Sequence, residues 1–71
     1  MEIVLESVNL LPFDLLVARF HARIWADLMS RGQMIGAHDL LIAATAVAYE
    51  LPLVTENRRE FARVEGLELI G

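Results

Sequence analysis

The sequence predicts an α/β domain in which helices flank a parallel sheet, with three strands, two main helices and one short helix. Two observations lead to this prediction. Residues 40–49 carry no charge, and alanines separate their larger apolar side chains, as in a helix buried on several sides. Residues 51–55 follow directly and fit a short buried parallel strand with a proline at its entry. A helix, a tight turn and a buried strand are half of an α/β unit.

The first elements are separated by Pro12 and Asp14. Residues 1–13 are expected to form a strand that Pro12 ends, although Glu2 and Glu6 fit the end of a helix equally well. Asp14 is expected to cap the next helix, which we prefer to a catalytic role for this residue.

The helix expected over residues 15–30 has an apolar arc wider than one sheet face requires. Its polar side chains share one narrow face: Arg19, Arg23, Asp27 and Ser30. The wide arc predicts a protein–protein contact, with Phe20, Trp25 and Met29 as interface residues. His21 lies in this arc and is expected to be a satisfied core or interface histidine.

Turn residues mark the remaining boundaries. Gly32 is expected to end the first helix in the left-handed conformation, and Glu50 to close the central helix. A short helix is expected to run from Asn57 to about Val64. Residues 67–70 are then expected to form a final edge strand.

Asp39 stands at the start of the uncharged central helix and has two explanations. An acid in the first turn satisfies free amide donors and complements the positive end of the helix dipole. A carboxylate at the rim of a buried helix is also a hard oxygen ligand for Mg²⁺ or Mn²⁺. One carboxylate does not decide between them.

Polar residues follow the strand at 51–55, at the end where ligands bind in parallel sheets. Thr55 and Asn57 lie there, followed by Arg58 and Arg59. Each also has an ordinary structural explanation, because Asn57 fits a helix cap and the two arginines fit a solvated face.

Composition excludes several classes of protein. The 71 residues are 56% hydrophobic, with a mean hydropathy of +0.49. We therefore expect a second chain or a missing segment to cover part of the core. There is no cysteine for a thiolate site, and His21 and His38 lack the spacing of a zinc motif. The net charge of −4 argues against a general nucleic-acid coat protein, yet all six basic residues are arginine, which suits phosphate contacts.

The segments that would indicate export or a membrane are not found. The N-terminus lacks the basic start and apolar run of a signal peptide, and the uncharged run at 40–49 is too short to span a bilayer. We expect a cytoplasmic protein without a membrane partner.

Taken together, these segments resemble the C-terminal half of PIN-domain nucleases, specifically the VapC-type toxins of bacterial and archaeal toxin–antitoxin pairs. Two motifs in tandem carry the resemblance, and a strand-to-helix junction supports it. The first motif comprises Gly32, Ile35-Gly36 and residues 39–46, and the second comprises residues 53–55, Asn57 and Glu60-Phe61. The junction is formed by residues 8–14.

The resemblance implies an endoribonuclease that uses Mg²⁺ or Mn²⁺ and has an antitoxin protein as its partner. In that scheme Asp39 and Asn57 match the third and fourth acidic positions, so both are metal ligands and catalytic residues. Thr55 orients the site by hydrogen bonding. Arg58 and Arg59 are expected to contact RNA phosphates, which we infer from their position.

The chain departs from the family pattern because it has no strand with an Asp-Thr-Asn-like motif and no later helix with a metal-binding glutamate. Residues 1–71 are therefore expected to be a partial PIN-like domain, with a gap in the sheet between the strand near Val8 and the strand near Val54. We expect weak metal binding, an inactive isolated chain, and a poorly stable monomer that forms homo-oligomers. The alternative is a non-catalytic PIN-like module for interaction or dimerisation.

Overall fold

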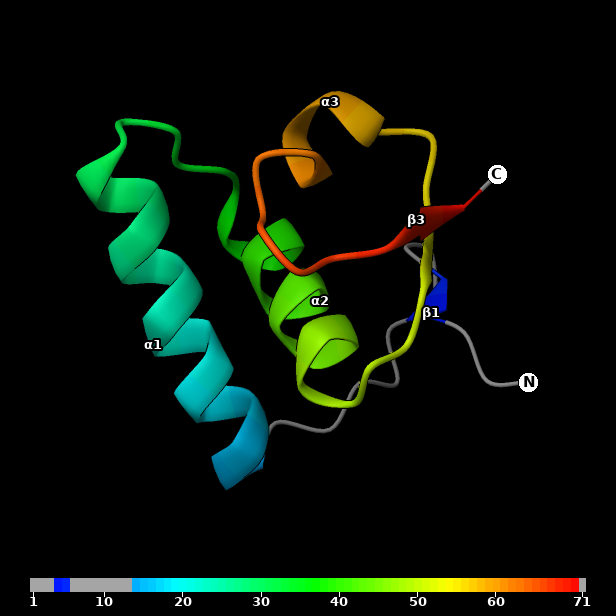
Figure 1. The fold of residues 1–71 in the computed structure, drawn as a ribbon, viewed down its shortest axis with the longest axis horizontal. Coiled ribbons are helices and arrows are strands. Elements are labelled where there is room, and N and C mark those ends of the chain that lie inside the picture. The colour runs from blue at the N-terminus through cyan, green and yellow to red at the C-terminus, as the bar shows by residue number, and fades with distance from the viewer. Residues whose placement is uncertain (1–3, 6–13, 71) are drawn as a thin grey trace.

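Two helices and a small sheet form three layers, with α2 between α1 and the sheet (Figure 1). The computed structural model describes residues 4–5 and 14–70. Their elements are β1 (Val4–Leu5), α1 (Leu15–Ser30), α2 (Ala37–Ala48), β2 (Leu53–Val54), α3 (Arg58–Phe61) and β3 (Leu69–Ile70). The predicted α/β class is confirmed.

Helix α1 begins and ends where the sequence predicts. The Oδ1 of Asp14 accepts the Val17 N–H at 2.9 Å, which is the expected N-cap. Gly32 follows the helix with φ +64°, in the left-handed conformation that favours glycine. The buried side chains of α1 are Val17, Ile24 and Leu28, which form one narrow stripe toward α2.

Helix α2 is the most deeply buried element of the described residues. Its buried residues are Leu40, Ile42, Ala43, Ala44, Thr45 and Ala46. This confirms the prediction of a helix packed on several sides, because the alanines let α1 and the sheet approach closely. Glu50 closes the helix with φ +53°, and the Leu51 N–H then donates to the Ala46 carbonyl at 2.8 Å.

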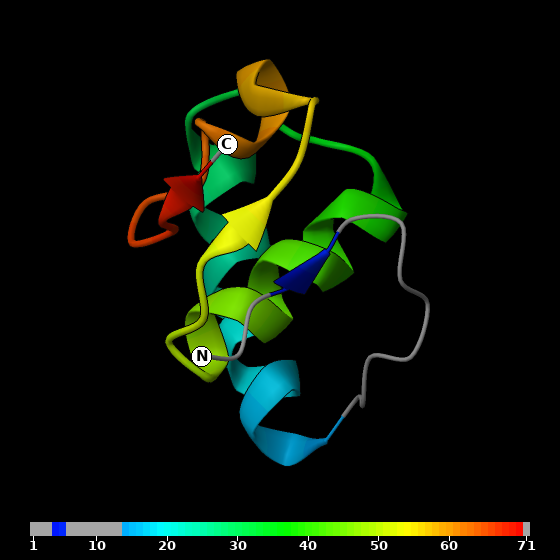
Figure 2. The same cartoon turned by 90° about the vertical axis from the view of Figure 1, so that its right-hand side faces the viewer.

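The three strands are parallel and lie in the order β1-β2-β3 across α2 (Figure 2). Val4 pairs with Leu53, and Leu53 pairs with Leu69 on the other side, so β3 is the predicted edge strand. β1 lies directly next to β2, so no gap separates these two described strands. Pairing on both sides satisfies the backbone groups of this buried strand. The strand expected near Val8 lies outside the described residues.

The predicted extent of the short helix is also wrong. α3 ends at Phe61 and does not reach Val64. The chain leaves the helix through turns, and Gly66 with φ +83° directs it into β3. Val64 is buried through packing on the core, with 4% of its surface exposed, and this packing needs no further helical turn.

A side-chain hydrogen bond joins the start of α1 to the end of α2. The Tyr49 hydroxyl donates to Asp14 Oδ2 while Asp14 Oδ1 accepts the N–H of Val17. The hydrogen bond from Tyr49, followed by the one from Val17, lowers the pKa of the Asp14 carboxyl. The bond to Asp14 likewise raises the pKa of the Tyr49 hydroxyl. Neutral tyrosine and charged aspartate therefore coexist at neutral pH.

We expect this pair to make stability depend on pH at both extremes. The pKa of Asp14 is depressed in the fold, so its contribution is present above an unfolded pKa of about 3.9 and is lost as pH falls through the folded value. The pKa of Tyr49 is raised, so its contribution is present below an unfolded pKa of about 10 and is lost as pH rises through the folded value.

The Tyr49→Phe variant tests this dependence. Thermal midpoints measured by circular dichroism should differ most from the parent near neutral pH, and the difference should shrink below about pH 4 and above about pH 10. Both side chains are exposed, so added salt should reduce the difference. A difference that stays constant across the range would contradict the prediction.

Candidate active site

Asp39 lies in the first turn of α2, as predicted, with its side chain partly buried. The helix starts after Gly36, which supplies no side-chain cap. An acid in this turn complements the positive end of the helix dipole. Asp39 also faces polar side chains from another part of the chain, so the dipole does not fully account for its position.

The segment after β2 brings Asn57 to Asp39. Thr55 is buried, and its Oγ1 accepts the Asn57 N–H at 3.0 Å, which turns the chain back toward α2. Asn57 Nδ2 donates to Glu60 Oε2 at 2.6 Å and makes a longer contact of 3.5 Å with Asp39 Oδ2. The predicted residues Asp39, Thr55 and Asn57 therefore lie together where α2, β2 and α3 meet.

Asn57 does not use its side chain to cap α3. It occupies the N-cap position, but no side-chain capping hydrogen bond is formed there. The sequence allowed Asn57 to be explained as a helix cap. Its backbone occupies the cap position, but the explanation is wrong for its side chain. The amide instead links acids from two helices, Asp39 from α2 and Glu60 from α3.

Glu60 is a member of this site. The pKa of its carboxyl is lowered first by the hydrogen bond from the Asn57 amide and second by a hydrogen bond with the Asp39 carboxyl. Desolvation raises this pKa, while the Arg63 guanidinium and the Gly36 backbone amide lower it. Glu60 is thus held in its charged form beside a second acid.

The sequence does not identify Glu60 as a site residue. Glu60 stands out there only as part of a motif with Phe61. The signal that would identify it is its distance from Asn57, because residues three apart across a helix start face each other. Phe61 is fully buried and holds this turn against the core.

The donor set suits a hard divalent cation. Asp39 and Glu60 offer carboxylate oxygens and Asn57 carries an amide oxygen, which are ligand types that Mg²⁺ and Mn²⁺ prefer. Mg²⁺ keeps several waters and binds through one or two carboxylates together with substrate phosphates. Among the described residues, no group of three His, Cys, Asp or Glu side chains is placed to hold a metal ion. The site therefore offers two acidic side chains, Asp39 and Glu60. Asn57 directs its nitrogen at both acids, and its oxygen would reach a cation only after the amide rotates.

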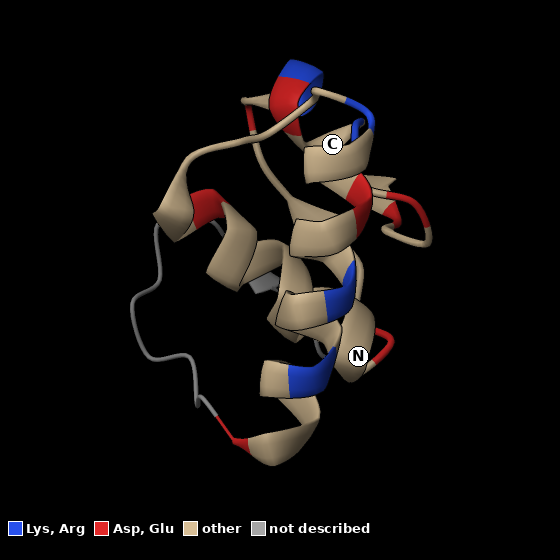
Figure 3. Ribbon diagram, turned by 90° about the vertical axis from the view of Figure 1, so that its left-hand side faces the viewer, with Lys and Arg blue, Asp and Glu red and all other residues tan. Residues whose placement is uncertain are grey.

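The two predicted RNA contacts, Arg58 and Arg59, form the start of α3 and are exposed. They follow Asn57 directly. Figure 3 shows that α3 carries basic and acidic residues side by side, whereas most of α2 is uncharged. Positive charge is therefore present on the same short helix as Glu60.

The predicted interface residues lie on two different surfaces. Trp25 and Met29 are exposed on α1, at 46% and 52% of their surface. Phe20 is partly buried against the core, and the Arg23 guanidinium lies 5.0 Å from its ring centroid. None of the described helices is long and apolar enough to cross a membrane.

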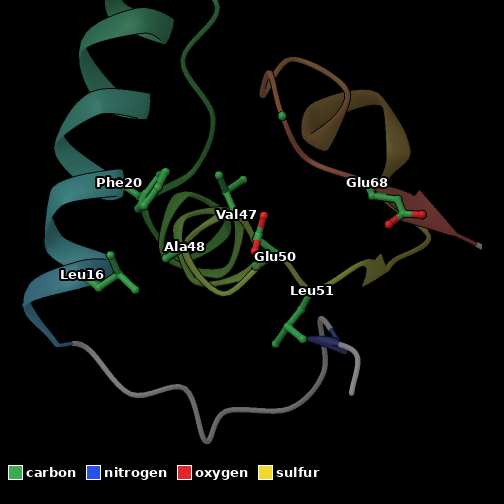
Figure 4. Close-up of a pocket in the computed structure, with 9 residues that line it drawn as sticks. Leu16, Phe20, Val47, Ala48, Glu50, Leu51 and Glu68 are labelled. Carbon is green, nitrogen blue, oxygen red and sulfur yellow. The ribbon is translucent and has the colours of Figure 1, made fainter. Parts of the chain in front are cut away.

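Phe20 borders an open, mainly apolar pocket of about 550 Å³ between α1, the C-terminal part of α2 and the segment before β3 (Figure 4). The residues that line it are Leu16, Phe20, Ala46, Val47, Ala48, Glu50, Leu51, Gly66 and Glu68. The acidic site is separate from this pocket, because Asp39 lies in the first turn of α2. The interface role of Phe20 stays a prediction, for this second surface.

Comparison with known sequences identifies related ribonucleases. The sequence model of the PIN domain family matches residues 2–67. Ribonuclease VapC of Rickettsia bellii is 42% identical over 69 residues, which are 97% of this chain and 52% of the relative. The tRNA(fMet)-specific endonuclease VapC of Shigella flexneri is 37% identical over 87% of this chain and 47% of its own length. The chain spans about half the length of these curated relatives.

Solved structures of toxin–antitoxin complexes share the fold. VapBC-1 from nontypeable Haemophilus influenzae aligns with a TM-score of 0.81 and 31% identity over 92% of this chain and 48% of the other. VapBC2 from Rickettsia felis, bound to a DNA fragment from its promoter, aligns with a TM-score of 0.77 and 35% identity over 80% and 43%.

Proposed function

Because this chain belongs to the PIN-domain family, we propose that it forms part of a VapC-type toxin ribonuclease that cleaves RNA phosphodiesters with the help of Mg²⁺ or Mn²⁺. PIN-domain nucleases generally depend on a divalent metal. Residues 1–71 would make up a partial PIN domain, in keeping with the half-length match to the relatives.

The observation that carries this proposal is the link that Asn57 makes between two acids from different helices. Its amide donates to Glu60 Oε2 at 2.6 Å and lies 3.5 Å from Asp39 Oδ2. The Asp39 carboxyl also forms a hydrogen bond with Glu60, so the two acids lie against each other, an arrangement that neither helix needs for its own stability. Paired acids near a parallel strand's carboxyl end are instead suited to binding a cation.

In this proposal each residue has a distinct task. Asp39 and Glu60 hold the divalent cation, which when bound lowers the pKa of a coordinated water and offsets charge on the phosphoryl oxygens. Asn57 holds the two carboxylates together through its amide nitrogen, and on cation binding the amide would turn to present its oxygen instead. Thr55 fixes the backbone of Asn57 through the 3.0 Å hydrogen bond.

The arginines at the start of α3 supply the contact with RNA. Arg58 and Arg59 are exposed and follow Asn57 directly in the chain, so we expect their guanidinium groups to meet a phosphate bound near the acids. Arginine binds phosphate with a planar fork of donors. The two arginines place positive charge locally beside the site, in a chain whose net charge of −4 would by itself repel RNA.

The proposal is tested with a chimera in which this chain replaces the matching 69 residues of the Rickettsia bellii ribonuclease VapC. The chimera should cleave RNA with Mg²⁺ or Mn²⁺ and lose all cleavage in EDTA. The chain alone should be inactive, because its two described carboxylates hold a cation weakly without further ligands. If the parent ribonuclease cleaves RNA and the folded chimera does not, the proposal is wrong.

A second candidate function, a non-catalytic module for interaction or dimerisation, is favoured by the exposed apolar surface of α1. Leu15, Trp25 and Met29 expose 69%, 46% and 52% of their surface. We propose that Trp25 and Met29 contact a second copy or the antitoxin, the partner found in the related complexes. This function alone would leave the chimera without cleavage activity.

We expect the chain to self-associate through this surface. The Trp25→Ala/Met29→Ala variant should weaken dimerisation at least about 10-fold in sedimentation equilibrium, because exposed tryptophans often dominate interface energy. The Arg19→Ala variant, changed on the polar face of the same helix, should associate as the parent does. A parent chain that stays monomeric would contradict the prediction.

A further inference from the structure

Two arginines connect the segment after α3 with the end of α1 and the loop before α2. Arg63 Nη1 donates to the Met34 carbonyl at 3.1 Å. Arg31 Nη2 donates to the Arg63 carbonyl at 2.6 Å, and the same guanidinium binds Asp27 Oδ2 through Nη2 at 2.6 Å and Nε at 3.1 Å. Arg63 is therefore held at its backbone and uses its side chain to hold another segment.

The segment held by Arg63 leads directly to Asp39. Met34 is followed by the buried Ile35 and by Gly36, after which α2 begins. On the other side, the Arg63 N–H donates to the Glu60 carbonyl at 3.1 Å, so its backbone is fixed to the residue that carries the second acid. The hydrogen bond from Arg63 to Met34 thus spans the two parts of the chain that supply the acidic pair.

We propose that Arg63 is a positioning residue for the acidic site, because its hydrogen bond to the Met34 carbonyl fixes the start of α2 against α3 and so sets the separation of Asp39 and Glu60. The inference rests on the proposed function for its consequence in catalysis. Its geometric part concerns only the contacts within this chain.

Two features explain why a contact of this kind is needed. The two acids come from separate helices, and the Asn57 amide reaches Asp39 only across 3.5 Å, near the limit of a hydrogen bond. Arg63 is the first positively charged residue after Glu60 in the sequence, and its charge stabilises the charged form of the Glu60 carboxyl group. Arginine suits this place because one planar group can donate to a carbonyl while keeping its charge near an acid.

The test compares Arg63→Met, which keeps an apolar stem but removes donors and charge, with Arg63→Lys and with the control Arg19→Met. The probe is the pair of Asn57 side-chain amide resonances in ¹H–¹⁵N spectra of the chain. In Arg63→Met they should move toward the positions of a solvent-exposed asparagine, and Arg63→Lys should restore most of the shift. Arg19→Met makes the same chemical change at an exposed site on α1 and should leave them unchanged.

Activity of the chimera provides a second readout. Arg63→Met should lower kcat about 10-fold or more with little change in KM for RNA, as expected for a group that orients ligands. A purely structural role would lower the thermal midpoint and leave the Asn57 resonances of the folded population in place. That result would overturn the inference.

A further variant covers the case in which Arg63→Met does not fold. Arg31→Met removes the donor to the Arg63 carbonyl and should move the Asn57 resonances in the same direction by a smaller amount. Unchanged resonances in this variant would overturn the inference. Moved resonances with a chimera that cleaves no RNA would keep the positioning role and reject the ribonuclease proposal.

Discussion

The Asp39→Asn change should reduce RNA cleavage by the chimera on the order of 10³-fold without unfolding it. Asparagine has nearly the same shape as aspartate but removes one of the two carboxylates that we propose hold the cation. Folding should be preserved, because an asparagine amide can still donate to the Glu60 carboxylate that the Asp39 carboxyl contacts. Cleavage rates at saturating RNA, with thermal midpoints measured in parallel, provide the test.

The matched control is Glu50→Gln, which removes one negative charge at the opposite end of α2. It should leave cleavage within about 2-fold of the parent, since surface changes away from a site have small effects. If Asp39→Asn retains the parent rate, the carboxylate is only a helix-dipole partner and the proposed site is wrong.

The Phe61→Ala change should cost about 3–5 kcal/mol of the free energy of unfolding. Phe61 is among the largest fully buried side chains, and it anchors α3 against the core. Folded domains are stable by only about 0.05–0.15 kcal/mol per residue, so a 71-residue chain loses much of its stability. The site should be disordered as well, because Asn57 and Glu60 lie on this turn.

Urea denaturation followed by circular dichroism measures this effect. The control Leu15→Ala truncates an apolar side chain that is 69% exposed, and it should change stability by less than about 0.5 kcal/mol. A loss below about 1 kcal/mol for Phe61→Ala would mean that the core closes around the missing ring and that α3 does not depend on it.

The sequence predicts α1 and α2 well because their limits are local. Asp14 and Gly32 act through their own side chain and backbone conformation, so α1 is correct at both ends. The end of α3 depends on tertiary packing, since Val64 is buried without being helical, and no periodicity reveals this. Strand order is a long-range property, which is why the direct pairing of β1 with β2 was not foreseen.

The site was predictable in part for the same reason. Asp39, Thr55 and Asn57 can be identified from their places at element ends, and the fold brings them together. The roles of Glu60 and Arg63 depend on side-chain directions that residue types do not determine. From the sequence, Asn57 fits either a helix cap or a metal ligand. Only its contacts in the structure exclude a capping role for its side chain.

The narrow attachment of α1 has a consequence for how the molecule opens. The buried side chains of this helix are Val17, Ile24 and Leu28, and the Asp14–Tyr49 and Arg31–Arg63 hydrogen bonds hold its two ends near the surface. The amides of α1 should therefore exchange with solvent deuterium as one cooperative unit, through an opening that costs less than global unfolding. The amides in the middle of α2 should become accessible only when the whole chain unfolds, so the two helices belong to different folding units.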